Sequence, residues 1–82
     1  MQDEINFPQH RRYLNGKNYF RIFSRNSFEE IRSVGSKWII ETHQVKILPD
    51  RNFVEDLLFG FEGIAEPISS LDYDNIRTKA EK

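Results

Sequence analysis

The densest apolar stretch of the chain lies between residues 37 and 48. Trp38-Ile39-Ile40 is apolar at three consecutive positions, which is typical of a strand that is buried on both faces. Val45 and Ile47 then alternate with polar residues, which is typical of a strand with one solvated face. A glycine lies just before this stretch and a proline just after it, so turn-forming residues limit it at both ends. The pattern predicts a long central strand around which the rest of the chain packs.

An earlier stretch, residues 12–23, predicts a β-hairpin. Asn15-Gly16 separates two runs of strand-forming residues, and this dipeptide favours a type I′ turn, in which both central residues have positive φ. After the turn, Phe20 and Ile22 alternate with a second set that also contains aromatic residues. The alternation therefore does not show which face of the hairpin is buried.

Residues 27–35 have the features of a short helix. Ser27 and Glu30 have the spacing of a capping box, in which each side chain binds the backbone amide of the other residue. Apolar residues recur at helical spacing from Phe28, and Gly35 can end a helix in the left-handed conformation. The pattern predicts a helix of two turns that packs on the sheet.

The second half of the chain predicts two more helical segments and a short strand. A helix from Asp50 to about Phe59 would place four apolar side chains on one face, and Gly60 would end it. Residues 64–68 can form a short edge strand that Pro67 interrupts, and Ser69-Ser70 can cap a third helical stretch. We expect residues 1–9 to be a loose lead-in and residues 77–82 to fray.

These elements predict a single domain, residues 1–82, of the α+β class. We expect a small mixed or antiparallel sheet made of the hairpin, the long central strand and a possible short edge strand. Two short helices are expected on one face of this sheet. The predicted order is ββαβα(β)(α), in which parentheses mark the possible short edge strand and the third helical stretch.

Composition narrows the class of protein. The chain has no cysteine, so disulfides and thiolate metal sites are excluded. Its longest apolar runs are three residues and no signal-peptide pattern is present, so we expect a soluble cytoplasmic protein without a membrane partner. The net charge of −1 is unevenly distributed, because residues 9–28 carry +5 and residues 50–82 carry −4. A basic front and an acidic rear are therefore the main polar feature.

The basic hairpin is the first candidate binding site. Guanidinium groups can neutralise phosphates and aromatic rings can stack on unpaired bases, so the hairpin is a candidate nucleic-acid surface. Against this interpretation, the chain is slightly acidic overall, with a pI near 6.1, and the aromatic residues can equally form the core while the arginines stay solvated. The candidate binding residues are Arg11, Arg12, Tyr13, Lys17, Tyr19, Arg21, Phe23 and Arg25.

Other candidate chemistry is sparse. Glu41 and His43 share a face if the strand is unbroken, and such a pair can act as a base or bind a metal. They lack a third group in the sequence pattern, so an exposed polar pair is the preferred interpretation. Gly60 and Gly63 match only the bare G-x-x-G of a KH-type loop, and the acidic residues fit no calcium loop. We expect no catalytic residue, metal or cofactor, and hence no enzyme.

Eleven aromatic residues are many for a chain of 82 residues, and a thin layer of helices does not cover them all. Aromatic residues beside arginines are common in protein interfaces. The sequence therefore predicts a non-enzymatic protein-interaction module that forms a homodimer through a sheet edge or an uncovered aromatic face. Nucleic-acid binding by the basic hairpin is the alternative.

Overall fold

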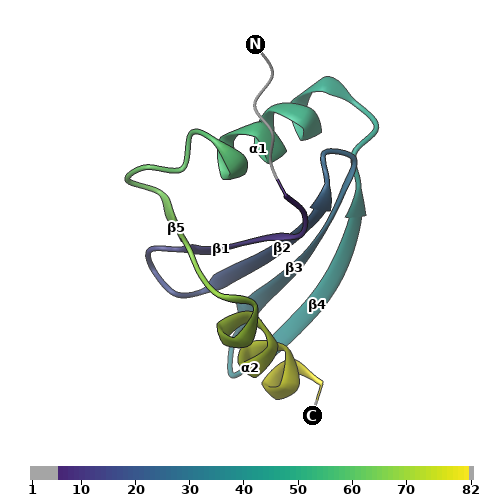
Figure 1. Cartoon of the computed structure of the whole chain (residues 1–82). Coiled ribbons are helices and arrows are strands. Elements are labelled where there is room, and N and C mark those ends of the chain that lie inside the picture. The colour runs from purple at the N-terminus through teal and green to yellow at the C-terminus, as the bar shows by residue number, and fades with distance from the viewer. Residues whose placement is uncertain (1–5, 82) are drawn as a thin grey trace.

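The computed structural model describes residues 6–81 and shows an α+β domain of five strands and two helices (Figure 1). The expected class is confirmed, and the observed order is ββββαβα. The elements are β1 (Gln9–Tyr13), β2 (Asn18–Ser24), β3 (Ser27–Val34), β4 (Lys37–Gln44), α1 (Leu48–Leu58), β5 (Ala65–Pro67) and α2 (Ser70–Ala80).

All five strands form one antiparallel sheet with the order β4-β3-β2-β1-β5. The first four strands follow one another through short turns, and β5 adds to the outer side of β1. The sequence predicted either a mixed or an antiparallel sheet, and the observed sheet is antiparallel. Strand β4 lies at one edge and β5 at the other.

The hairpin predicted at residues 12–23 is confirmed as β1 and β2. Its turn differs from the expected type I′, because Gly16 has a φ of 74° while no residue other than glycine has positive φ in the part of the chain described. The Gly16 amide donates to the Tyr13 carbonyl at 2.9 Å, and the Lys17 amide donates to Asn15 Oδ1 at 2.8 Å. The Asn15 side chain thus supports the turn by accepting a local hydrogen bond.

The prediction of a helix at residues 27–35 is wrong, because Ser27–Val34 is strand β3. In a strand, Phe28 and Ile31 point to opposite faces, and each is buried in a different hydrophobic cluster. Burial on both faces hides the alternation that normally identifies a strand. Gly35 is the first residue of the two-residue turn between β3 and β4 and has a φ of 62°. Glycine is preferred at this position of a type II′ turn.

The strand predicted from residue 37 is confirmed, but it is an edge strand rather than a central one and it ends at Gln44. Its apolar residues Trp38, Ile39 and Ile40 are only half-buried. Val45 follows the strand and is buried in the cluster beneath α1. The strand ends before the predicted end at Leu48, and helix α1 begins at that residue, two residues before the predicted start.

The two observed helices cover opposite faces of the sheet. The prediction that helices at residues 27–35 and 50–59 share one face is wrong, because the first of them is strand β3 and α2 covers the other face. Helix α1 closes a cluster that contains Phe20 and Phe28, whereas α2 closes a second cluster around Ile31. Strands β2 and β3 carry large side chains on both faces, so each face requires its own cover. Figure 1 shows the curved sheet with α1 near one end and α2 near the other.

Helix α2 is the third predicted helical stretch. Ser69 caps it, because its Oγ accepts the amide of Asp72 at 3.0 Å. The helix runs to Ala80, and fraying from residue 77 stays a prediction. Arg77 is held by an ion pair with Glu29 of β3. The short edge strand predicted at 64–68 is confirmed as β5. Of the predicted lead-in at residues 1–9, residues 1–5 lie outside the described residues, and Gln9 already belongs to β1.

A buried carboxylate ties α2 to the sheet. Glu29 is 6% exposed. Its Oε1 accepts the Tyr73 hydroxyl at 2.8 Å and Arg77 Nε at 3.1 Å. Burial alone would raise the pKa of Glu29, but the hydrogen bonds from Arg77 and Tyr73 outweigh it and hold the pKa below its ordinary value. Glu29 is therefore ionised and paired between β3 and α2.

Replacing Glu29 with Gln should lower the free energy of unfolding at neutral pH by about 1–3 kcal/mol, because two charge-assisted hydrogen bonds are weakened. The folded-state pKa of Glu29 lies below 4.5, its ordinary value. Its contribution is therefore complete above that pH and is lost as pH falls through the folded-state pKa. Urea unfolding across this range should show the two proteins converging in acid. A constant difference at every pH would contradict this role of the Glu29 charge.

Candidate interaction surfaces

The eight residues proposed for binding on the basic hairpin do not form one surface. Pairing in the sheet places Arg11 opposite Phe20 and Arg12 opposite Tyr19. Arg11 therefore lies on the α1 side, where Phe20 packs, and Arg12 lies on the α2 side. Tyr13 follows Arg11 to the α1 side, and Tyr19 packs near Trp38 on the α2 side. Lys17 lies in the first turn, Arg25 lies in the second, and Phe23 is 42% exposed.

Arg11 is a structural residue. It is 5% exposed, its Nε donates to the Leu57 carbonyl at 2.8 Å, and its Nη2 donates to the Leu58 carbonyl at 3.4 Å. These carbonyls lie at the C-terminal end of α1, where backbone acceptors lack helical partners. The guanidinium also lies 4.8 Å from the Phe61 ring centroid. Arg11 therefore joins β1 to the end of α1 and is not available to a ligand.

Three further arginines of the basic segment pair with carboxylates from the acidic half of the chain. Arg12 pairs with Glu66 of β5. Arg21 contacts Asp74 of α2 at 2.5 Å, and Arg25 contacts Glu55 of α1 at 3.3 Å. The opposite charges of residues 9–28 and 50–82 thus meet within the folded chain.

The outer edge of β4 offers unpaired backbone groups. The Val45 amide, just beyond β4, donates to the Asn26 carbonyl on the β3 side at 2.7 Å. Because backbone direction alternates along a strand, odd-numbered residues of β4 face β3 and even-numbered ones face outward. Within residues 6–81, no other strand borders this side. The outward residues are Trp38, Ile40, Thr42 and Gln44.

The two edges of the sheet are protected differently. Strand β5 has three residues and ends in Pro67, and short strands and prolines are common protections of an edge. Strand β4 has eight residues and no proline, and it pairs with β3 without a bulge along its length. The edge of β4 is thus open to another strand, whereas that of β5 is not.

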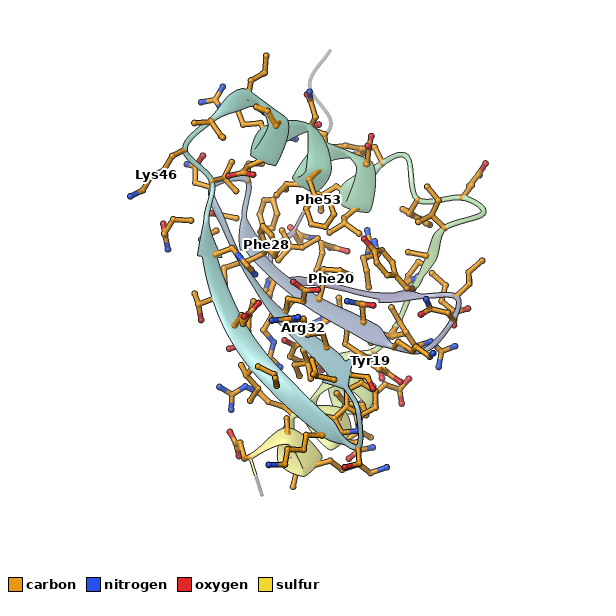
Figure 2. The ribbon with its side chains drawn as sticks, turned by 180° about the vertical axis from the view of Figure 1, so that it is seen from behind. Tyr19, Phe20, Phe28, Arg32, Lys46 and Phe53 are labelled. Carbon is orange, nitrogen blue, oxygen red and sulfur yellow. The ribbon has the colours of Figure 1, made fainter. Side chains whose placement is uncertain are left out.

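Ile39 is a half-buried apolar residue without a place in either cluster. It lies opposite Arg32 of β3, on the face that α1 covers farther along the sheet. Figure 2 shows Phe28 and Phe53 beneath α1 and Arg32 farther from the helix on the same side. Among the described residues, Ile39 packs against neither cluster. A single apolar residue at a surface is ordinary, so Ile39 matters here only because it lies on the strand with the open edge.

The same open part of the sheet holds a polar group. Glu30 lies opposite Glu41, and His43 is the next residue on that face. His43 Nε2 lies 3.3 Å from Glu30 Oε1 and 3.7 Å from Glu41 Oε1. A hydrogen bond from Arg32 lowers the pKa of Glu41. The prediction that Glu41 and His43 share a face is therefore confirmed, and Glu30 is the third group that the sequence pattern did not show.

The other histidine lies elsewhere. His10 is buried on the α2 side, where its ring lies 5.4 Å from that of Tyr73 and its Nε2 accepts Arg21 Nε at 3.1 Å. Burial, followed by the charge of Arg21, lowers the pKa of His10. The two histidines are therefore on opposite faces of the sheet.

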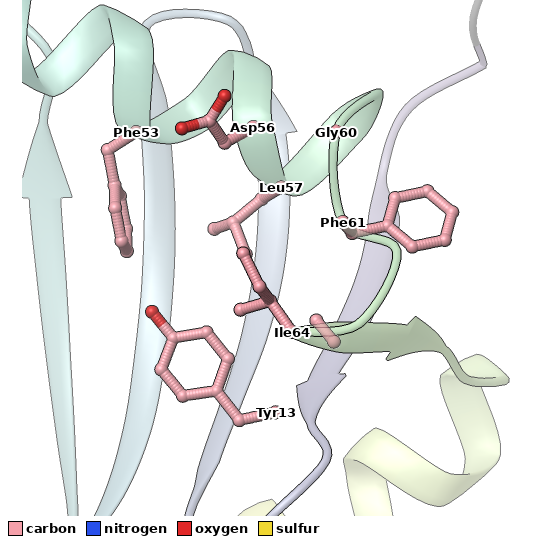
Figure 3. A pocket seen from close by; sticks show the side chains of 8 residues that line it. Tyr13, Phe53, Asp56, Leu57, Gly60, Phe61 and Ile64 are labelled. Carbon is pink, nitrogen blue, oxygen red and sulfur yellow. The ribbon is translucent and has the colours of Figure 1, made fainter.

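A small apolar pocket lies where the end of α1 meets β1 (Figure 3). Its volume is about 120 Å³, and Tyr13, Phe53, Leu57 and Ile64 are among the residues that line it. Gly60 and Phe61, from the loop that carries Gly60 and Gly63, also line it. This loop follows the helix end and has an acidic residue between the glycines, so it lacks the positive charge that a phosphate clamp needs.

Known proteins give no guide to the function of this chain, so a functional assignment rests on the surfaces described above. No protein-family model, no curated protein and no solved structure matches the chain. In the described part of the chain, no helix is long and apolar enough to cross a membrane.

Replacing Arg11 with Ala should lower the free energy of unfolding by about 2–4 kcal/mol, since it leaves buried carbonyls at the end of α1 without donors. Arg25→Ala is the matched control. Arg25 forms an exposed ion pair, and its loss should change stability by about 0.5 kcal/mol or less. Urea unfolding measures both, and equal effects of the two variants would contradict the structural role of Arg11.

Proposed function

We propose that the protein is a non-enzymatic interaction module that self-associates through the free edge of β4. The observation that carries this proposal is the contrast between the edges. Strand β4 presents eight regularly paired residues without proline, while β5 is short and ends in proline. Pairing of two β4 strands would satisfy outward backbone groups of both copies and continue the sheet.

The charges of β4 favour one register for this pairing. In an antiparallel pair related by a two-fold axis, residues that lie opposite each other point to the same face. An axis at Ile39 places Lys37 of each copy opposite Glu41 of the other, which pairs opposite charges. An axis at Glu41 would place two carboxylates opposite each other, which is unfavourable. We therefore place the axis at Ile39.

Apolar contacts support the same register. With the axis at Ile39, the two Ile39 side chains meet, and Trp38 of one copy lies opposite Ile40 of the other. All three residues are half-buried in the single chain, so pairing would remove more of their apolar surface from water. For a chain of 82 residues, such burial is a means of gaining stability.

Nucleic-acid binding has less support as the function. Arg12, Arg21 and Arg25 pair with carboxylates of the same chain, and Arg11 is buried. A nucleic acid would have to compete with these ion pairs. Fluorescence anisotropy of labelled oligonucleotides at low salt tests this alternative, because salt-sensitive binding there would favour it over the self-association proposed.

A single cysteine at position 39 tests the register directly, because the natural chain contains none. In the proposed dimer, two Cys side chains at this position would lie in a non-hydrogen-bonded pair, whose Cα atoms are roughly 4.5 Å apart and within disulfide range. Mild oxidation of Ile39→Cys should therefore give a covalent dimer. Glu62→Cys, in the exposed loop after α1, is the control and should remain mostly monomeric. Equal crosslinking of both would contradict the register.

Ile39→Glu should convert the protein to a folded monomer. The substitution places two like charges at the axis, whereas within one chain the new carboxylate lies opposite Arg32 and Ile39 packs against neither hydrophobic cluster, so the fold should tolerate it. Light scattering should show that the mass of the unaltered protein rises with concentration while that of the variant does not. Ile39→Val is the conservative control and should behave as the unaltered protein. A mass of one chain for the unaltered protein at high micromolar concentration would refute self-association.

A further inference from the structure

Three potential metal ligands converge on the open part of the sheet beside α1. They are Glu30 of β3 and Glu41 and His43 of β4, and their donor atoms lie within 4.8 Å of one another. The register dictates this convergence, because Glu30 is directly opposite Glu41 and His43 follows Glu41 by two residues on the same face. The cluster lies on two neighbouring strands, and rigid elements of this kind hold ligands in place.

His43 Nε2 is buried although part of the imidazole is exposed. This atom has no hydrogen-bond partner, yet it lies 3.3 Å from Glu30 Oε1 and 3.7 Å from Glu41 Oε1. A buried polar atom without a partner is unfavourable. A cation that contacts all three donor atoms would satisfy each of them.

Each of the three side chains is held by another residue. The imidazole of His43 stacks on Phe28 with ring centroids 4.8 Å apart. Asn18 Nδ2 donates to Glu30 Oε2 at 2.7 Å, which leaves Oε1 directed at His43. Arg32 donates to both oxygens of Glu41 at 2.9 and 3.2 Å. Supporting contacts of this kind orient the ligands of metal sites.

We infer that Glu30, Glu41 and His43 form a site for a divalent transition-metal ion of the zinc class. One imidazole nitrogen and two carboxylate oxygens suit Zn²⁺, and three protein ligands leave a fourth position for water. The imidazole disfavours Mg²⁺ and Ca²⁺, which prefer oxygen ligands. Arg32 lowers the expected affinity for the ion, because its positive charge lies beside the site and it also binds the Glu41 carboxylate. This site shares the Glu41 side chain with the proposed pairing of two β4 strands, in which Lys37 of the second copy would lie opposite Glu41, but none of its ligands is an outward backbone group.

Titration of the untagged 82-residue chain with Co²⁺ and Zn²⁺ tests this site. Co²⁺ should produce visible absorption bands typical of bound cobalt, Zn²⁺ should displace it, and calorimetry should give one Zn²⁺ per chain. His43→Gln and Glu30→Gln each remove one ligand with little change in size, and each should weaken Zn²⁺ binding by at least about 10-fold. Circular dichroism should show that both variants remain folded.

His10→Gln is the matched control, because His10 is the other histidine of the chain and lies on the opposite face. It should bind Zn²⁺ as the unaltered protein does. Absence of cobalt bands and of Zn²⁺ heat in the unaltered protein would overturn the proposal. Binding that survives in both His43→Gln and Glu30→Gln, or that is lost in His10→Gln instead, would overturn it as well, because the ion would then bind elsewhere.

Discussion

Coverage of β3 on both faces is the constraint on which the rest of the structure depends. Phe28 points to one side of the sheet and Ile31 to the other, and both are buried. One helix cannot cover two faces, so α1 and α2 separate and close one cluster each. Since α2 also packs against β4, the open surface of β4 is on the α1 side. The half-buried Ile39 and the polar group of Glu30, Glu41 and His43 lie there.

Electrostatics within the chain reinforce this arrangement. The basic first hairpin lies next to the elements that carry the acidic residues, so Arg12 meets β5 and Arg21 meets α2. Glu29 reverses the pattern, because it is a buried carboxylate in β3 that takes its partners from α2. The uneven charge of the sequence is therefore mainly an internal complementarity that positions the helices. It is not by itself a signal for a charged ligand.

The sequence predicted the elements with clear local signals. Asn15-Gly16 located the first hairpin, Ser69 located the start of α2, and Pro67 marked β5 as an edge strand. Strand β3 was not predictable from such signals, because the serine and glutamate of a capping box and the i, i+3 spacing of Phe28 and Ile31 also suit a strand that is buried on both faces. Because this element was predicted as a helix, β4 was expected at the centre of the sheet, and helices were expected on only one face.

The same error concealed the polar site. Glu41 and His43 were recognised as neighbours from their spacing within one strand. Glu30 was assigned to a helix, and its place opposite Glu41 depends on the β3–β4 register. The turn at Gly35 was the available signal, since Gly-Ser between two strand-like runs also fits a type II′ hairpin. Long-range pairings such as that of Arg11 with the end of α1 have no local signal at all.

The central claim is that the outward backbone of β4 is free in one chain and paired in two. Residue-resolved amide hydrogen exchange at low and high protein concentration tests it most directly. We predict fast exchange in dilute protein for the outward amides, with Trp38 and Ile40 becoming protected as the concentration rises. The inward amides of Ile39 and Glu41 should be protected throughout. Outward amides that exchange fast at every concentration would contradict pairing through this edge, and outward amides already protected in the dilute monomer would contradict a free edge.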